Sequence, residues 1–237
     1  MSFKQIILLF TVGAGLWACS SVRNIYVQTD RVPVTTLTEP NDSISQFIKP
    51  YKNELSYEMD KVIGYATKDF VRYRPEGSLG NFVVDATLDY LIRSNEIPKD
   101  RYICLMNHGG LRAPISEGNI TTGDIYKLMP FDNTVVIAKL PMSALDSICD
   151  YIKSSGGEPI AGFTVKNGPC SLNYENTSDT LYVVTSDYLF NGGDHMNFFE
   201  MNYSSRNTGV FLRDMLIDYV KVQDTIRPVI EGRINFE

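Results

Sequence analysis

Hydrophobic positions change spacing repeatedly along the chain, which predicts alternating helices and strands. Apolar side chains recur at three- and four-residue steps, the spacing of amphipathic helices, in residues 44–59, 79–93 and 210–222. Short continuous apolar runs predict strands at residues 62–66, 102–106, 134–140 and 181–186. Because helices and strands alternate throughout, we expect one mixed α/β domain over residues 42–237.

Prolines and capping residues set limits to several of these elements. Pro50 lies inside the first apolar stripe and should kink or divide that helix. Thr121 and Asp124 have the spacing of a capping box, which predicts a helix that Pro130 ends. Pro141 directly follows the strand 134–140, and proline is favoured in the first turn of a helix. We therefore expect the next helix to begin at Pro141.

The first 41 residues have a different character. Residues 6–18 form an apolar run that is too short to span a bilayer and is typical of a signal peptide. The run ends at Leu16-Trp17-Ala18-Cys19, which looks like a lipobox. We expect a signal peptide at 1–18, a lipidated Cys19 that attaches the protein to a membrane of the cell envelope, and an extended tether at 19–41. The alternative is an ordinary signal peptide cleaved nearby.

Composition limits the possible partners. The chain has 237 residues, 43% of them hydrophobic, enough to bury a substantial core. The net charge is −6, and no basic stripe is present that could neutralise a run of phosphates. We therefore expect no nucleic-acid partner.

The four cysteines favour structural roles over metal binding. If Cys19 carries lipid, the remaining three allow at most one internal disulfide, and its pairing stays open. Cys104 falls in an apolar strand and Cys149 on an apolar helix face, so both are expected to be buried thiols; the third is Cys170. No Cys/His spacing indicates a metal site in this chain.

Two glycine turns follow predicted strands, and each carries polar side chains that suit a ligand. The first is residues 107–110, with Asn107 at its start and Arg112 just beyond it. An amide and a planar cation suit hydroxyls, carboxylates or phosphates. The second is residues 191–194, where Asp194 can accept hydrogen bonds from sugar hydroxyls. Glycine lets the backbone of such turns approach a ligand closely.

Two aromatic residues accompany these turns. Phe131 follows a helix-ending proline, and Tyr188 precedes the second turn by three residues. Two rings held on loops could hold a planar base between them, each contributing about 1–3 kcal/mol by analogy with base stacking.

Three stretches in this order resemble the C-terminal domain of the 5′-nucleotidase family: LGNFVVDATLDYL, NHGGLRAPISEGNITTGDIYKLMPFDNTVVIAKL and DYLFNGGDHMNFF. The similarity runs from about residue 44 to the end of the chain. It implies a four-layer α/β/β/α domain that binds the nucleoside part of a nucleotide.

The resemblance implies roles for individual positions. Asn107, Gly109 and Arg112 match the turn that contacts substrate, and Gly193 and Asp194 match the motif that binds the ribose. Phe131 and Tyr188 match the two sides of the base sandwich. The family often has a basic residue where this chain has Pro75, so Arg74 or Arg72 is expected to make that phosphate contact instead.

The metal ligands of a complete 5′-nucleotidase are missing from the sequence. The family's metallophosphoesterase domain holds two metals in several His- and Asp-containing motifs, whereas this chain has two histidines, His108 and His195, outside such motifs. We therefore expect no cofactor and no catalytic residue in this chain, and a separate metallophosphoesterase that holds the divalent metals. The alternatives are a surface nucleoside-binding protein without a catalytic partner, and a repurposed enzyme with His195 or Asp194 as a general base.

Overall fold

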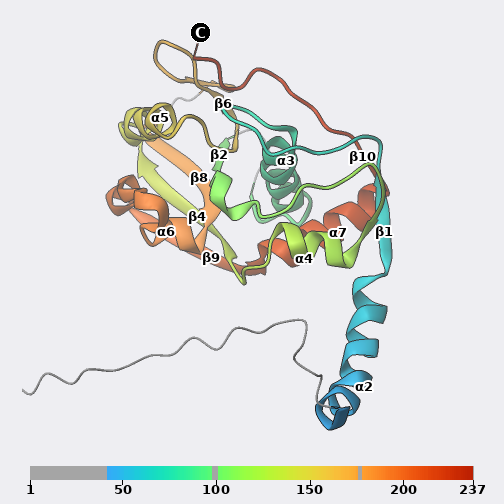
Figure 1. The fold of residues 1–237 in the computed structure, drawn as a ribbon. Helices are drawn as coiled ribbons and strands as arrows, with labels where there is room; N and C mark the ends of the chain where they lie inside the picture. Colours follow the sequence, from blue (N-terminus) through green and yellow to red (C-terminus); the bar gives the residue numbers. More distant parts are fainter. Residues whose placement is uncertain (1–41, 98–100, 176–177, 237) are drawn as a thin grey trace, which may run out of the picture. The chain divides into compact units, whose positions relative to one another are not determined.

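The computed structural model describes residues 42–97, 101–175 and 178–236 (Figure 1). The predicted signal peptide, Cys19 and the tether lie outside the described residues. Residues 47–236 belong to one compact unit. Within the described ranges, no helix has both the length and the apolar character needed to cross a membrane.

The larger sheet has five strands in the order β5-β2-β8-β4-β9. Their bounds are β2 Tyr102–Leu105, β4 Thr134–Pro141, β5 Ile160–Ala161, β8 Thr180–Ser186 and β9 Ser204–Phe211. Strands β2 and β8 run parallel, and the other neighbours are antiparallel. Because β2 and β8 are parallel neighbours, the chain segments that follow them leave the same edge of the sheet. Both glycine turns therefore start from this edge.

A smaller three-stranded sheet has the order β10-β1-β3, with β1 Val62–Ala66, β3 Gly118–Thr121 and β10 Thr225–Ile226. A short hairpin pairs β6 Phe163–Thr164 with β7 Ser171–Leu172. The predicted strands 62–66, 102–106, 134–140 and 181–186 are all confirmed to within one residue at each end. Strand β9 and the short strands β3, β5, β6, β7 and β10 had no prediction, because they are too brief or too polar to produce a distinct hydrophobic pattern.

The helices lie in layers with the two sheets (Figure 1). The main ones are α3 Ser78–Arg93, α4 Thr122–Leu128, α5 Ala144–Ser155 and α7 Leu212–Gln223. One core joins α3 and α7 to the small sheet and to one face of the large sheet. A second core lies on the opposite face of the large sheet, where α5 packs together with η3 Asn197–Met201. Helices therefore pack on both faces of the large sheet, and the predicted mixed α/β class is confirmed.

Alternating side chains along the central strands supply both cores. In β2, Ile103 faces the second core and Cys104 the first. In β8, Val183 and Val184 divide in the same way. This alternation is a consequence of the two-residue repeat of a β-strand, and it explains why both strands form continuous apolar runs in the sequence.

The predicted capping box is confirmed, and of the kink or division predicted at Pro50, division does not occur. Thr121 and Asp124 are bonded reciprocally at the start of α4. Helix α2, Asp42–Met59, contains Pro50 and continues through it. None of the α2 residues is buried, so water can hydrate the carbonyl group that loses its amide partner.

The predicted helix start at Pro141 is wrong. Pro141 is the last residue of β4, opposite Thr180, and α5 begins at Ala144. The amide of Met142 donates to the carbonyl of Asp179, which keeps the chain against β8 for one more residue. A proline is tolerated there because the bond next to the Pro141–Thr180 pair is donated by Met142, so no amide hydrogen is required at residue 141.

Cys149 is buried, as expected, and the structure settles the disulfide pairing that the sequence left open. Cys149 and Cys170 form a disulfide between α5 and the segment before β7. Cys104 is a free, fully buried cysteine in the first core, and burial raises the pKa of its thiol. The sequence limit of one internal disulfide is therefore consistent with the structure, but only the fold identifies the pair.

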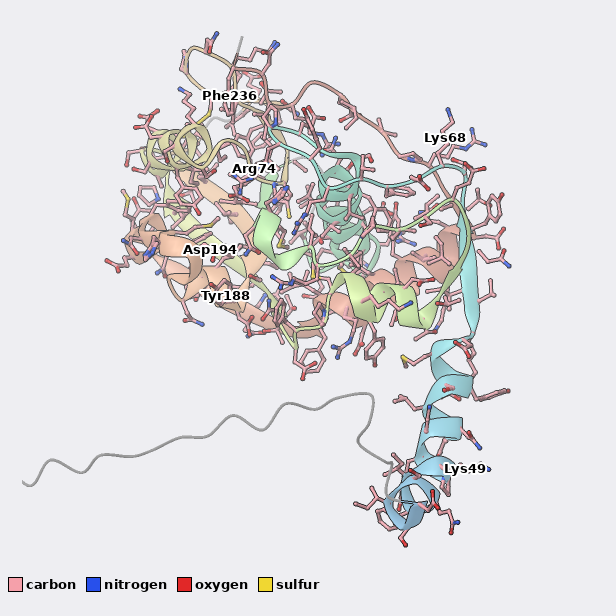
Figure 2. All side chains as sticks on the ribbon, in the orientation of Figure 1. Lys49, Lys68, Arg74, Tyr188, Asp194 and Phe236 are labelled. Atoms are coloured by element: carbon pink, nitrogen blue, oxygen red, sulfur yellow. A yellow bond between two sulfur atoms is a disulfide. The ribbon has the colours of Figure 1, made fainter. Side chains whose placement is uncertain are left out.

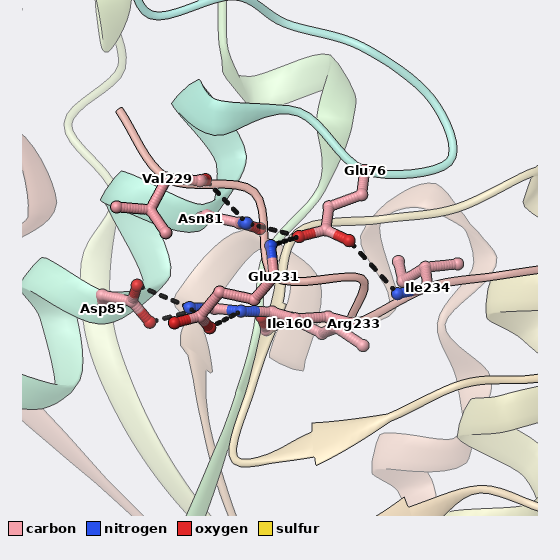
Figure 3. Close-up of polar contacts among 8 residues, drawn as sticks. All are labelled: Glu76, Asn81, Asp85, Ile160, Val229, Glu231, Arg233 and Ile234. Atoms are coloured by element: carbon pink, nitrogen blue, oxygen red, sulfur yellow. Dashed lines mark hydrogen bonds and ion pairs between the residues drawn. The ribbon is translucent and has the colours of Figure 1, made fainter. Parts of the chain in front are cut away.

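The C-terminal segment is fixed across α3 by a polar network (Figure 3). Arg233 is 7% exposed and forms a two-pronged ion pair with Asp85 at 2.8 and 2.7 Å. Glu76 accepts hydrogen bonds from the side chain of Asn81 at 2.6 Å and from the amide of Glu231 at 2.9 Å. Both α3 and the loop before it are thereby joined to the end of the chain.

Candidate functional site

A cavity of about 330 Å³ lies where the two glycine turns meet. The residues that line it are Asn107, Gly109, Gly110, Arg112, Phe131, Asn133, Tyr188 and Asp194. Six of these were singled out in the sequence, and three separate stretches of the chain contribute them. Gly193 does not line the cavity itself, but it lies against the ring of Tyr188, which does. Arg74 does not line the cavity.

The first turn directly follows β2. Asn107 precedes the short helix η1, His108–Gly110, and its side chain points across to Asp194. A Cβ atom at Gly110 would lie 2.7 Å from the side-chain oxygen of Asn107. Glycine at 110 is therefore required for Asn107 to take this position.

Asp194 is the common partner of the polar groups around the cavity. Its two carboxylate oxygens accept hydrogen bonds from Asn107 Nδ2 at 2.6 Å and from the Tyr188 hydroxyl at 2.8 Å. Its backbone carbonyl accepts the hydroxyl of Tyr151, on α5, at 2.9 Å. Asp194 has a φ of 52°, in the left-handed region that aspartate tolerates better than most residues. Figure 2 shows Tyr188 and Asp194 beside one another.

The tyrosine hydroxyls that contact Asp194 are both less acidic than usual. The pKa of Tyr188 is raised by its hydrogen bond to the Asp194 carboxylate and by the negative charge there. Burial, with the charges of Glu158 and Asp194 nearby, raises the pKa of Tyr151 to about 12. Both groups therefore stay protonated at neutral pH and act as donors.

Tyr188 belongs to the short helix α6, Asp187–Phe190, and its ring lies over Gly193. A Cβ atom at Gly193 would lie 2.5 Å from Tyr188 Cε1 and 2.6 Å from Cζ. Gly193 thus provides the space that the ring occupies. Tyr188 remains 46% exposed, so one side of the ring is available to a ligand.

Phe131 forms another part of the wall, on the loop between α4 and β4. It is 44% exposed, an unusual degree for a phenylalanine. The guanidinium carbon of Arg112 lies 6.0 Å from the centre of its ring, and Arg112 also donates to the Gly109 carbonyl at 3.4 Å. The cavity therefore combines two accessible rings with a cation and a carboxylate.

Arg74 lies outside the cavity and is paired with Glu158. Its guanidinium donates to Glu158 Oε1 at 2.9 Å, and the other carboxylate oxygen accepts the amide of His108. Glu158 is 4% exposed, and this burial raises its pKa even though Arg74 and the His108 amide favour the charged form. Burial and the nearby Arg74 and Arg72 lower the pKa of His108, so its ring is neutral at pH 7. Arg74 therefore supports the first turn from behind through Glu158.

Two residues at the site were not singled out in the sequence. Asn133 lines the cavity, and its place two residues after Phe131 was the available signal. Tyr151 gave no such signal, because its position on α5 resembles that of any partly buried residue on an amphipathic helix. Only the contact with Asp194 identifies it.

The acidic, histidine and cysteine side chains do not form a metal site in the described ranges. No group of three or more of them is arranged to hold a metal ion there.

Comparisons of the sequence and of the fold relate this chain to one family of known proteins. Residues 62–146 match the family described as "5′-nucleotidase, C-terminal domain". The chain is 30% identical, over 88% of its length, to the trifunctional nucleotide phosphoesterase protein YfkN of Bacillus subtilis (strain 168). It is 25% identical, over 78% of its length, to a 5′-nucleotidase of Homo sapiens. The crystal structure of a 5′-nucleotidase precursor from Thermus thermophilus superposes with a TM-score of 0.67 over 83% of this chain, at 25% identity.

Each of these proteins is much longer than the matching region. The chain spans 16% of the B. subtilis protein, 38% of the human one and 44% of the T. thermophilus structure. The similarity therefore describes a single domain of these larger proteins.

Proposed function

Because this chain carries a 5′-nucleotidase C-terminal domain, we propose that it is the substrate-binding half of a nucleotide phosphohydrolase. The base of the nucleotide stacks between Phe131 and Tyr188, and the sugar lies against Asp194. The observation that supports this most directly is one cavity lined by two accessible rings together with Asn107, Arg112 and Asp194.

The polar groups of the cavity suit the sugar and the phosphate of a nucleotide. A carboxylate offers about four acceptor sites, and Asp194 uses two of them for Asn107 and Tyr188. The others are available to a pair of sugar hydroxyls, which are hydrogen-bond donors. Arg112, a fixed cation at the same cavity, suits the phosphate, since guanidinium groups bind such oxygens with good geometry.

The reaction itself is assigned to another protein in this proposal. A metallophosphoesterase supplies the divalent metals that activate water and stabilise the leaving oxygen. The residues of this chain bind and orient the nucleotide for that partner. Positioning of this kind can account for a large part of a rate enhancement.

A second candidate is a nucleoside- or nucleotide-binding protein that acts without a catalytic partner. It would use the same cavity-lining residues, among them Phe131, Tyr188 and Asp194, for binding alone. The two candidates share the same binding site and differ only in whether a second protein hydrolyses the bound nucleotide.

Calorimetry of the purified protein with adenosine and adenosine 5′-monophosphate tests the shared site. We expect measurable binding that is lost in a variant with both Phe131→Ala and Tyr188→Ala. Tyr203→Ala is a matched control, because Tyr203 is an exposed ring that does not line the cavity. Undiminished binding by the double variant would contradict the base-stacking arrangement.

Phosphate release separates the two candidates. In cells that make this protein, metal-dependent hydrolysis of adenosine 5′-monophosphate should fall when the gene is deleted and return with the wild-type chain, but not with the double variant. Hydrolysis that is independent of this chain, together with intact nucleoside binding, would favour the second candidate.

We also propose that Cys19 carries the lipid that attaches the protein to a membrane of the cell envelope. The lipobox-like sequence before it supports this. Cells supplied with a labelled fatty acid should label the wild-type protein, and Cys19→Ser should abolish the label. Equal labelling of both proteins would refute the assignment.

A further inference from the structure

The two segments that carry Phe131 and Tyr188 are joined by direct side-chain bonds outside the cavity. Strand β4 begins at Thr134, three residues after Phe131, and α6 begins at Asp187, one residue before Tyr188. Both segments start where β4 and β8 stop pairing, because Val135 lies opposite Ser186 in the ladder. Beyond this point, backbone pairing no longer fixes the distance between the rings.

Asp187 continues the connection past the end of the ladder. Its Oδ1 atom accepts the backbone amide of Thr134 at 3.1 Å, and its Oδ2 atom accepts the Thr134 hydroxyl at 2.9 Å. The same Oδ1 atom accepts the amide of Tyr188 at 2.8 Å. One carboxylate thus holds the backbone at both sides of the cavity.

The Thr134 hydroxyl has a second partner that fixes its direction. Asn207 of β9 donates to it at 2.7 Å, so the hydroxyl hydrogen is directed to Asp187. A carboxylate that receives several hydrogen bonds is held firmly in one orientation. The segment with Phe131 has a further anchor, since Arg213 of α7 bonds Asp132 at 2.7 Å and lies over the ring of Tyr126 at 4.3 Å.

We infer that Asp187 is a positioning residue, which sets the separation of the Phe131 and Tyr188 rings and thereby matches the cavity to a planar aromatic ring. It does so without lining the cavity. The inference rests on the proposed function for the identity of the ligand, but the positioning of Tyr188 is a property of the protein alone.

The inference is therefore tested by two measurements, a spectrum of the free protein and the affinity for a ligand. The protein is labelled with 3-fluorotyrosine, and its ¹⁹F spectrum is recorded, with Tyr188→Phe used to assign the Tyr188 signal. In Asp187→Ala, the Tyr188 signal should shift and broaden. Asp187→Asn should restore it, because the amide oxygen can accept both backbone amides and the amide group can donate to the Thr134 hydroxyl.

Asp69→Ala is the matched control. The Asp69 carboxylate likewise accepts a backbone amide, that of Glu117 at 2.7 Å, but at a loop that does not line the cavity. This variant should leave the Tyr188 signal unchanged. An unchanged Tyr188 signal in Asp187→Ala would overturn the inference.

Ligand binding gives the second reading. Adenosine 5′-monophosphate should bind Asp187→Ala about tenfold more weakly, the loss expected when one stacking contact is loosened. Asp187→Asn should restore binding to within about twofold of the wild type. Wild-type affinity in Asp187→Ala would overturn the inference while leaving the proposed function intact. If the wild type bound no nucleotide, the proposed function would fail, and the ¹⁹F spectra alone would decide whether Asp187 positions Tyr188.

Discussion

The side-chain amide of Asn107 lies 2.6 Å from a carboxylate oxygen of Asp194, a residue 87 positions further along the chain. This hydrogen bond joins the two glycine turns into one wall. Tyr188 and Tyr151 bond the same aspartate from two other elements. The polar end of the cavity is therefore formed before any ligand arrives, which reduces the ordering cost of binding.

Replacing Asp194 with Asn should weaken nucleoside binding without unfolding the domain. Asparagine tolerates the left-handed backbone at this position, and it can still bond Asn107 if the amide of Asn107 reverses its orientation. The negative charge is lost, and a hydrogen bond to a charged group contributes about 1 kcal/mol more than a neutral one. Calorimetry should show about tenfold weaker binding of adenosine. Glu200→Gln removes a negative charge at an exposed position that does not line the cavity and is the control; equal affinities for all three proteins would contradict the role of Asp194.

Gly193→Ala should disturb the site by steric overlap. The added methyl group would lie 2.5 Å from the Tyr188 ring, which must move away. Overpacking of this kind costs about 1–3 kcal/mol, measurable by urea denaturation, and nucleoside binding should weaken with it. At Gly168 no atom lies within 4 Å of the corresponding position, so Gly168→Ala should have neither effect. Wild-type stability and affinity in Gly193→Ala would show that the ring does not rest there.

Removing the disulfide should lower stability by about 3 kcal/mol. Cys149 and Cys170 are separated by 21 residues, and closing a loop of that size reduces the entropy of the unfolded chain by about this amount. Denaturation of the Cys149→Ala, Cys170→Ala double variant should match that of the reduced wild type. Two additional reactive thiols in the unreduced, denatured wild type would show that the bond does not form.

Protonation of Glu76 should lower the stability of the domain in acid. Burial by itself raises the pKa of Glu76, but hydrogen bonds from Asn81 and from the backbone amides of Glu231 and Ile234 outweigh it and lower the pKa below 4.5. A lowered pKa in the folded state means that this contribution is complete above about pH 4.5 and is lost as the pH falls through the lowered value. In Glu76→Gln, the unfolding free energy should therefore fall less between neutral pH and pH 3. Glu117→Gln, at an exposed carboxylate, should behave as the wild type, and a parallel fall in all three proteins would refute the assignment.

Local signals in the sequence predicted most of the elements. Apolar runs and helical spacing located β1, β2, β4, β8, α3 and α7, because burial of one or both faces of an element leaves a periodic pattern. The wrong prediction of a helix start at Pro141 has a different cause. Proline is acceptable both at a helix start and at a strand end, and only the hydrogen bond from Met142 to Asp179 distinguishes the two.

Local signals in the sequence also predicted part of the candidate site. The sequence shows the glycine turns and the aromatic residues near them, which is why it predicts Asn107, Arg112, Phe131, Tyr188 and Asp194 as site residues. The structure places all five around one cavity. Arg74 shows the limit of this approach. The resemblance implied a phosphate contact for Arg74 or Arg72, and that contact stays a prediction. The structure adds that Arg74 pairs with the buried Glu158, a partner that the sequence pattern does not indicate.

The sequence by itself determined which segments form helices and strands, which residue types come after the strands, and the resemblance to the C-terminal domain of 5′-nucleotidases. The tertiary structure decided which of those residues meet. Parallel pairing of β2 with β8 brings the turns of Asn107 and Asp194 to one edge of the sheet. Periodicity reports how each segment is buried, whereas the choice of its neighbour depends on the packing of the whole core. For the same reason, the partners of Cys149, Arg74 and Asp187 are visible only in the folded chain.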